Sequence, residues 1–154
     1  MKKIRKLLKE YVLILIYILI INVLLSFSTI SLHELGHFLV GLISGCKNIM
    51  IILFDTKNFG TYTSMNCDPG VNVNLIALGP LLFLTPFSML FLLIKKPEKF
   101  YGLMILGLNF IINISDMQKI TKSSFVYILE IAAGFSLIIY SEILIINYIL
   151  CNKK

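Results

Sequence analysis

Residues 11–44 read YVLILIYILIINVLLSFSTISLHELGHFLVGLIS, an apolar run long enough to cross a lipid bilayer. As one helix rising about 1.5 Å per residue, the run would be about 50 Å long, against about 30 Å for a hydrocarbon core. It must therefore tilt, kink or project beyond the bilayer. Two shorter helices meeting at residues 26–31 are the alternative, but no Pro or Gly there favours a break.

The run contains the pentapeptide His33-Glu34-Leu35-Gly36-His37, which holds both histidines of the chain. Positions i and i+4 share one face of a helix, so the two imidazoles can bind one metal ion. Glu34 lies beside them and can act as general base on a water molecule. This HExxH spacing is typical of zinc peptidase sites. The sequence predicts His33 and His37 as metal ligands and Glu34 as the catalytic residue; a polar patch that merely packs a membrane helix is the alternative interpretation.

Composition indicates that the whole chain is a membrane protein. Of 154 residues, 58% are hydrophobic, against about 45–50% in ordinary globular chains, and the mean hydropathy is +0.91. We therefore expect a single integral membrane domain over residues 1–154. Its predicted fold class is an all-α polytopic membrane protein with about four transmembrane helices. The expected spans are residues 11–44, 71–94, 101–115 and 124–149.

The net charge of +6 comes from lysines and an arginine at the chain ends and in short loops. This distribution predicts a lipid bilayer, and no nucleic acid, as partner. Four spans place both termini on one side, where the N-terminal cap, the 95–99 loop and the tail carry five, three and two basic residues. The other side carries Lys47, Lys57, Lys119 and Lys122. The positive-inside rule thus predicts a cell-membrane protein with cytoplasmic termini.

Residues 46–70 lack the membrane pattern and predict a β-hairpin at the membrane surface, between spans one and two. Residues 49–54 and 61–65 are β-favouring runs joined by turn-forming residues. Cys46 and Cys67 bracket this segment and could pair in an oxidising compartment. Two free thiols are the alternative.

A catalytic zinc site needs a third protein ligand besides the two histidines. Asp116 is the best candidate, because it ends a stripe with Asn109 and Asn113 at i, i+4 and i+7 on one helix face. In the four-span topology, Asp116 also shares the depth of the two histidines. Glu130 in the fourth span is the second candidate, and a helix-end role for Asp116 is a further alternative. We expect Asn109 and Asn113 to contact substrate or to orient the ligands of a bound Zn²⁺.

The chain resembles the site-2 protease family of intramembrane zinc metalloproteases in three features that occur in the same order. The pentapeptide at 33–37 matches the family's HExxH on a membrane helix, and residues 77–80 (ALGP) resemble its A-G-P signature. Residues 109–116 resemble the asparagine-to-Asp-Gly motif that supplies the third zinc ligand. This last motif departs from the family pattern at Ile112, where proline is common, and at Met117, where glycine is usual.

The resemblance implies a zinc metalloendopeptidase that hydrolyses peptide bonds in or next to transmembrane segments of membrane-protein substrates. The edge of the hairpin at residues 49–65 could hold an unwound substrate as an added strand. Two other classes remain open: a catalytically inactive relative that binds membrane proteins, and a zinc-binding or zinc-transport membrane protein. The intact Glu34 argues against the first, and the gathering of polar ligands at one end of the spans argues against the second.

Overall fold

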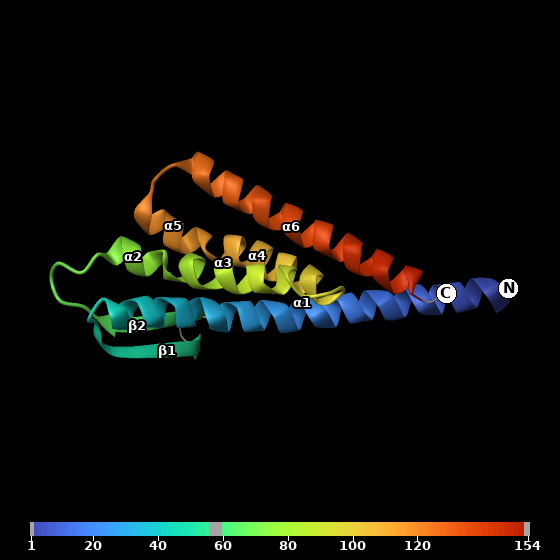
Figure 1. The fold of residues 1–154 in the computed structure, drawn as a ribbon, viewed down its shortest axis with the longest axis horizontal. Coiled ribbons are helices and arrows are strands. Elements are labelled where there is room, and N and C mark those ends of the chain that lie inside the picture. Colours follow the sequence, from blue (N-terminus) through green and yellow to red (C-terminus); the bar gives the residue numbers. More distant parts are fainter. Residues whose placement is uncertain (1, 56–59, 153–154) are drawn as a thin grey trace.

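The computed structural model describes residues 2–55 and 60–152, with side chains from residue 8 onward. Three parts of the predicted pattern therefore lie outside the described residues: the tip of the hairpin turn with Lys57, most side chains of the basic N-terminal cap, and the last two lysines. The elements are α1 (Lys2–Ile43), β1 (Lys47–Asp55), β2 (Gly60–Asn66), α2 (Val73–Ala77), α3 (Gly79–Leu92), α4 (Glu98–Ile112), α5 (Ile114–Ile120) and α6 (Ser124–Cys151). The long helices form an elongated bundle in which the start of α1 and the end of α6 lie at the same end (Figure 1).

Among the described residues, three helical segments are long and apolar enough to cross a membrane: Leu8–Ile43, Val73–Leu92 and Ser124–Cys151. A fourth span would require α4 and α5 to count as one broken helix, because they meet at an angle of 46°. The predicted fold class is thus confirmed in its coarser form: the chain is mostly helical, with three helices that could cross a membrane and a two-stranded sheet.

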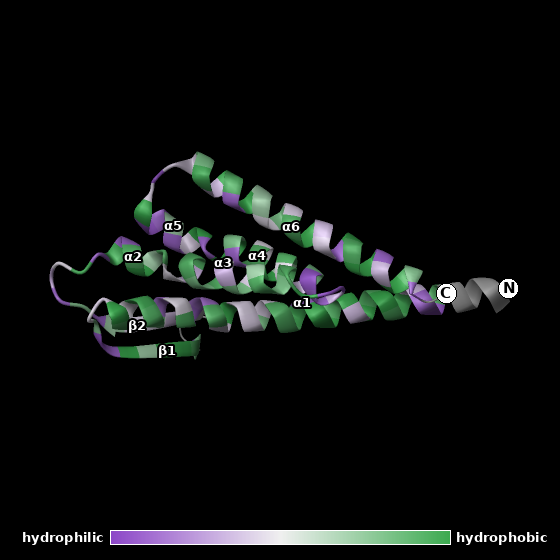
Figure 2. Ribbon diagram, viewed as in Figure 1, coloured by the Kyte–Doolittle hydropathy of each residue, from purple (hydrophilic) through white to green (hydrophobic). Residues whose placement is uncertain are grey.

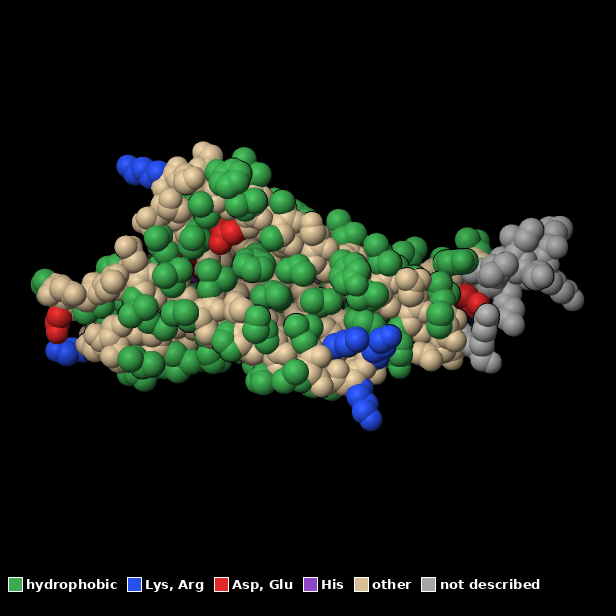
Figure 3. Space-filling model, turned by 45° about the horizontal axis from the view of Figure 1, so that its top comes forward, with side chains coloured by type: hydrophobic (Ala, Val, Ile, Leu, Met, Phe, Trp, Pro, Cys, Tyr) green, Lys and Arg blue, Asp and Glu red, His purple; other side chains and the backbone are tan. Residues whose placement is uncertain are grey.

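The surface of the bundle agrees with a lipid environment. Large hydrophobic side chains such as Leu19 and Phe135 are more than half exposed. Hydrophobic residues predominate along α1 and α6 (Figure 2), and hydrophobic side chains are spread over the length of the face drawn in Figure 3. Exposed apolar surface of this extent is compatible with a protein whose helices face lipid.

Helix α1 is continuous over 42 residues, or about 63 Å, so it does not divide into two helices near residues 26–31. The hydroxyl groups of Thr29 and Ser31 donate to the carbonyl oxygens of Leu25 and Phe27, four residues earlier. These bonds satisfy the polar side chains within the helix.

The second predicted span is divided at Leu78 into α2 and α3, and the predicted disturbance by Pro80 appears at this junction. Pro80 lies in the first turn of α3, where its missing N–H is not needed. The junction packs directly on α1, since a Cβ added at Gly36 would lie 2.6 Å from the Cα of Pro80. Such backbone contact between small residues is a common way for membrane helices to pack.

The predicted hairpin is present, with β1 and β2 antiparallel and Ile51 opposite Thr63. A disulfide joins Cys46 to Cys67 at its base, which decides between the paired and free alternatives. The hairpin lies beside the second half of α1 (Figure 1). A Cβ added at Gly41 of α1 would lie 2.8 Å from the Sδ of Met65, so β2 packs against the helix here.

Candidate metal centre

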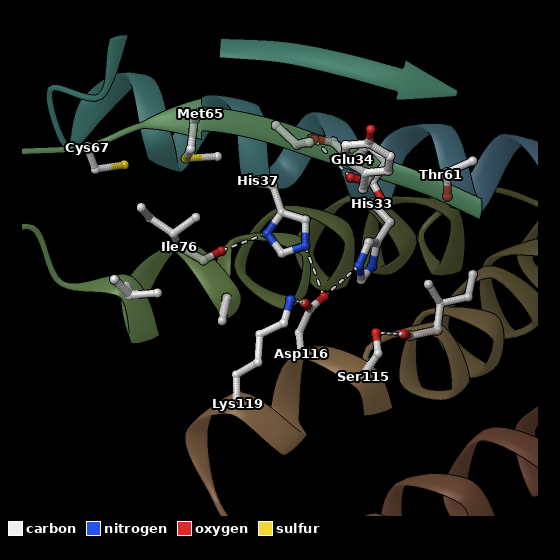
Figure 4. Close-up of a pocket in the computed structure, with 15 residues that line it drawn as sticks. His33, Glu34, His37, Thr61, Met65, Cys67, Ile76, Ser115, Asp116 and Lys119 are labelled. Atoms are coloured by element: carbon white, nitrogen blue, oxygen red, sulfur yellow. Dashed lines mark hydrogen bonds and ion pairs between the residues drawn. The ribbon is translucent and has the colours of Figure 1, made fainter. Parts of the chain in front are cut away.

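The three predicted metal ligands converge on one point between α1 and α5. The Nε2 atoms of His33 and His37 each lie 2.9 Å from the Oδ2 atom of Asp116. One ligand atom from each residue lies within 4.8 Å of the others. The three residues are 2%, 9% and 3% exposed, respectively, and Figure 4 shows them pointing toward one another. The helical i, i+4 spacing places both histidines on one face, and α5 supplies the carboxylate from the far part of the chain.

The environment of His37 leaves Nε2 as its ligand atom. Its Nδ1 lies 2.9 Å from the carbonyl oxygen of Ile76 in α2. A carbonyl oxygen only accepts, so Nδ1–H must donate, and Nε2 of the neutral ring then carries a lone pair. A backbone carbonyl in this role is a common way to orient a metal-binding histidine. The Ile76 carbonyl therefore fixes both the tautomer and the orientation of the His37 ring.

The donor set fits a metal cation. In the neutral ring of His37, the lone pair of Nε2 and an oxygen of the Asp116 carboxylate would face each other as two acceptors at 2.9 Å, an arrangement that requires a proton or a cation between them. Imidazole nitrogens and a carboxylate oxygen are zinc ligands, with bonds of about 2.0–2.2 Å. His33, His37 and Asp116 could therefore hold a metal ion.

A cavity of about 520 Å³ opens onto this group and would give a bound metal access to water and substrate. Glu34 lines the cavity, and its carboxylate is buried, with 6% of the residue exposed. The hydroxyl of Thr63 in β2 lies 2.8 Å from Oε2 of Glu34 and 3.0 Å from its backbone carbonyl oxygen. The hairpin thus orients the predicted general base, and β2 forms one wall of the cavity.

Asn109 and Asn113 do not line this cavity, and neither does Glu130. Both asparagine side chains are fully buried, and their amide atoms have no aligned hydrogen-bond partner among the described residues. The Asn113 amide lies against the Glu130 carboxylate of α6, but no well-aligned hydrogen bond joins them. The structure therefore brings Asp116, and not Glu130, to the histidines, while the roles of the two asparagines stay predictions.

Three residues beside the predicted ones were not identified from the sequence: Ile76, Thr63 and Lys119. Lys119 donates from Nζ to Oδ1 of Asp116 at 2.7 Å. Its i+3 spacing from Asp116 within one helix could have indicated this contact. Ile76 acts through its backbone and Thr63 through the packing of the hairpin on α1, so neither has a signal in the local sequence.

No protein-family model, curated protein or solved structure matches this chain. Fold and site together define a helical, membrane-type protein with a buried His-His-Asp group that could hold a metal ion. Function must be argued from that site, because a fold alone does not determine chemistry.

Proposed function

We propose that this protein is an intramembrane zinc metalloendopeptidase that hydrolyses peptide bonds in or next to transmembrane segments of other membrane proteins. The observation that carries the proposal is the group formed by His33, His37 and Asp116 beside the buried carboxylate of Glu34, on one cavity of an apolar helical bundle. A potential metal-binding group and an adjacent carboxylate are the two components of metal-assisted amide hydrolysis. The resemblance of the three sequence motifs to site-2 proteases supports the same conclusion.

Glu34 is the general base in this proposal. A zinc ion bound by the three ligands would supply Lewis-acid catalysis, which acidifies water and polarises a carbonyl group. Glu34 takes a proton from the attacking water and returns it to the amine that leaves. The Thr63 hydroxyl at 2.8 Å from Oε2 keeps the carboxylate oriented toward the cavity during these transfers.

The substrate is proposed to bind as an extended strand along β2. Thr61, Thr63 and Met65 of β2 line the cavity. Strand β2 pairs with β1 on one side, and its other edge has no strand partner among the described residues. An unpaired edge offers backbone hydrogen bonds to an added peptide strand. A transmembrane helix must therefore unwind locally before its peptide bond can reach Glu34.

Metal analysis tests the proposal most directly. Protein purified without chelators is expected to contain about one zinc ion per chain, as for a site with three protein ligands. His37→Ala should lose most of this metal and all cleavage of a transmembrane peptide. Cys151→Ala is the control, because it removes an exposed free thiol without touching the cavity. Zinc at the wild-type level in His37→Ala would refute the metal centre, and zinc without cleavage in the wild type would favour an inactive membrane-protein binder.

We also propose that α4 and α5 form one broken fourth span, so that both termini lie in the cytoplasm and the metal centre opens near the outer side of the membrane. In intact cells, an impermeant maleimide should label Lys122→Cys and should not label the native Cys151. Cys46 and Cys67 do not interfere, because they are joined in a disulfide. Permeabilised cells provide the control, since both thiols should then react. Labelling of Cys151 alone in intact cells would place the metal centre toward the cytoplasm instead.

A further inference from the structure

The two oxygens of Asp116 have different partners. Oδ2 lies 2.9 Å from the Nε2 atoms of both histidines, whereas Oδ1 accepts a hydrogen bond from the Nζ of Lys119 at 2.7 Å. The side chain of Asp116 is 4% exposed and that of Lys119 is 64% exposed. Figure 4 shows the lysine side chain reaching the carboxylate from the same helix. The buried carboxylate is thus divided between the metal-ligand group and an ammonium group at the cavity wall.

A carboxylate can bind a metal ion through one oxygen or through both. An ammonium group only donates, so it occupies Oδ1 with a charge-assisted hydrogen bond. An ion pair with such an exposed partner contributes little to folding stability. The ion pair nevertheless affects the site locally, because Oδ1 is buried and, without Lys119, would be free to turn toward a bound metal ion.

We propose that Lys119 is a positioning residue that restricts Asp116 to binding the metal through Oδ2 alone. The inference rests on the proposed metal centre and deepens it. A catalytic zinc site keeps one position open beside its three protein ligands. If Oδ1 also bound the metal beside the water, the site would become five-coordinate, and the carboxylate would crowd the position that water and substrate share. Lys119 therefore preserves the open position.

The coordination number of the bound metal tests this inference, whereas the metal affinity does not. Removing Lys119 frees Oδ1 as a further ligand and removes a positive charge that repels the metal, but it also loosens Asp116. These effects on affinity oppose one another. The visible absorption bands of Co²⁺, which can replace zinc in such sites, report the coordination number directly, because four-coordinate Co²⁺ absorbs more strongly than five-coordinate Co²⁺.

The experiment compares the Co²⁺-loaded wild-type protein with Lys119→Met, Lys119→Arg and Lys122→Met. Lys119→Met should show the weaker bands of a higher coordination number. Its cleavage rate should fall about 10–100-fold, the usual effect of removing a group that hydrogen-bonds a metal ligand. Lys119→Arg should restore both, because arginine can also donate to Oδ1. Lys122→Met is the matched control, since Lys122 does not line the cavity, and it should behave as the wild type.

Wild-type cobalt bands in Lys119→Met would overturn the inference, and a lower cleavage rate with those bands would assign Lys119 to substrate contact. If Lys119→Met does not fold, Lys119→Ala also removes the donor to Oδ1 and should give the same weaker bands; unchanged bands would again overturn the inference. A wild-type protein that binds no Co²⁺ would refute the metal centre itself. A wild-type protein that binds Co²⁺ without proteolysis would refute the protease proposal only, and the bands would still decide the role of Lys119.

Discussion

Asp116→Asn is expected to empty the metal centre and abolish proteolysis. The Oδ2 atom of Asp116 lies at 2.9 Å from both histidine nitrogens, so this change removes the only anionic ligand of the proposed site. We expect metal affinity to fall by at least about 100-fold, beyond the usual 10–100-fold effect of losing a group that only supports a ligand. Competition with a chelator of known affinity measures the loss, and cleavage of a transmembrane peptide measures activity.

Glu130→Gln is the matched control, because it makes the same change of charge at the other candidate ligand. Glu130 lies on α6 against Asn113 and does not line the cavity. Its amide variant should therefore keep the wild-type metal content. An empty site in Glu130→Gln, together with activity in Asp116→Asn, would show that the ligand assignment is wrong.

Glu34→Gln is expected to separate metal binding from catalysis. The glutamine can still accept the hydrogen bond from Thr63, which lies 2.8 Å from Oε2 in the native site, but it cannot take a proton from water. Loss of a general base typically costs about 10²–10⁴-fold in rate. Metal content should remain near one ion per chain, as expected for a site that keeps its three ligands.

Thr63→Ser provides the comparison for Glu34→Gln, because it retains the hydroxyl group that orients the carboxylate. It should keep both metal and most of the activity. If Glu34→Gln lost its metal, Glu34 would be a ligand, and if it kept full activity, another group would be the base.

The parts of the site on α1 could be predicted because they depend on local geometry. The i, i+4 spacing of His33 and His37 places them on one face of any helix, whatever the tertiary structure. The apolar run likewise predicted a span, and α1 is continuous to Ile43. The hairpin strands were also placed within two residues of β1 and β2, because β-branched and aromatic residues alternate with clear turn signals there.

The third span shows why the rest could not be predicted. Residues 101–115 were expected to form one span that ends at Asp116, with Asn109, Asn113 and Asp116 on one helix face. Instead α4 ends at Ile112, and α5 continues at 46° to it. Neither Pro nor Gly marks the junction, so the bend has no local signal. The two asparagines remain in the core, whereas Asp116 lines the cavity.

Polar residues inside the spans also have partners that only the fold brings close. The Nδ2 of Asn22 in α1 donates to Oε1 of Glu142 in α6 at 2.8 Å, across 120 residues of sequence. Such a bond satisfies two polar groups that would be costly in lipid if left alone. The pairing of Asn22 with Glu142 cannot be predicted from their spacing in the sequence, since both residues lie in long apolar helices with many equivalent faces.

The contact between Gly36 and Pro80 restricts how the metal-binding pentapeptide can vary. In the general HExxH pattern, the two central positions accept many residue types. Here the second of them is closed to every residue with a β-carbon, because that atom would lie 2.6 Å from the Cα of Pro80. Gly79 is restricted in return, since its own β-carbon would lie 2.7 Å from the carbonyl oxygen of Gly36. Mutational tolerance should therefore be low at both glycines, although neither carries any chemistry.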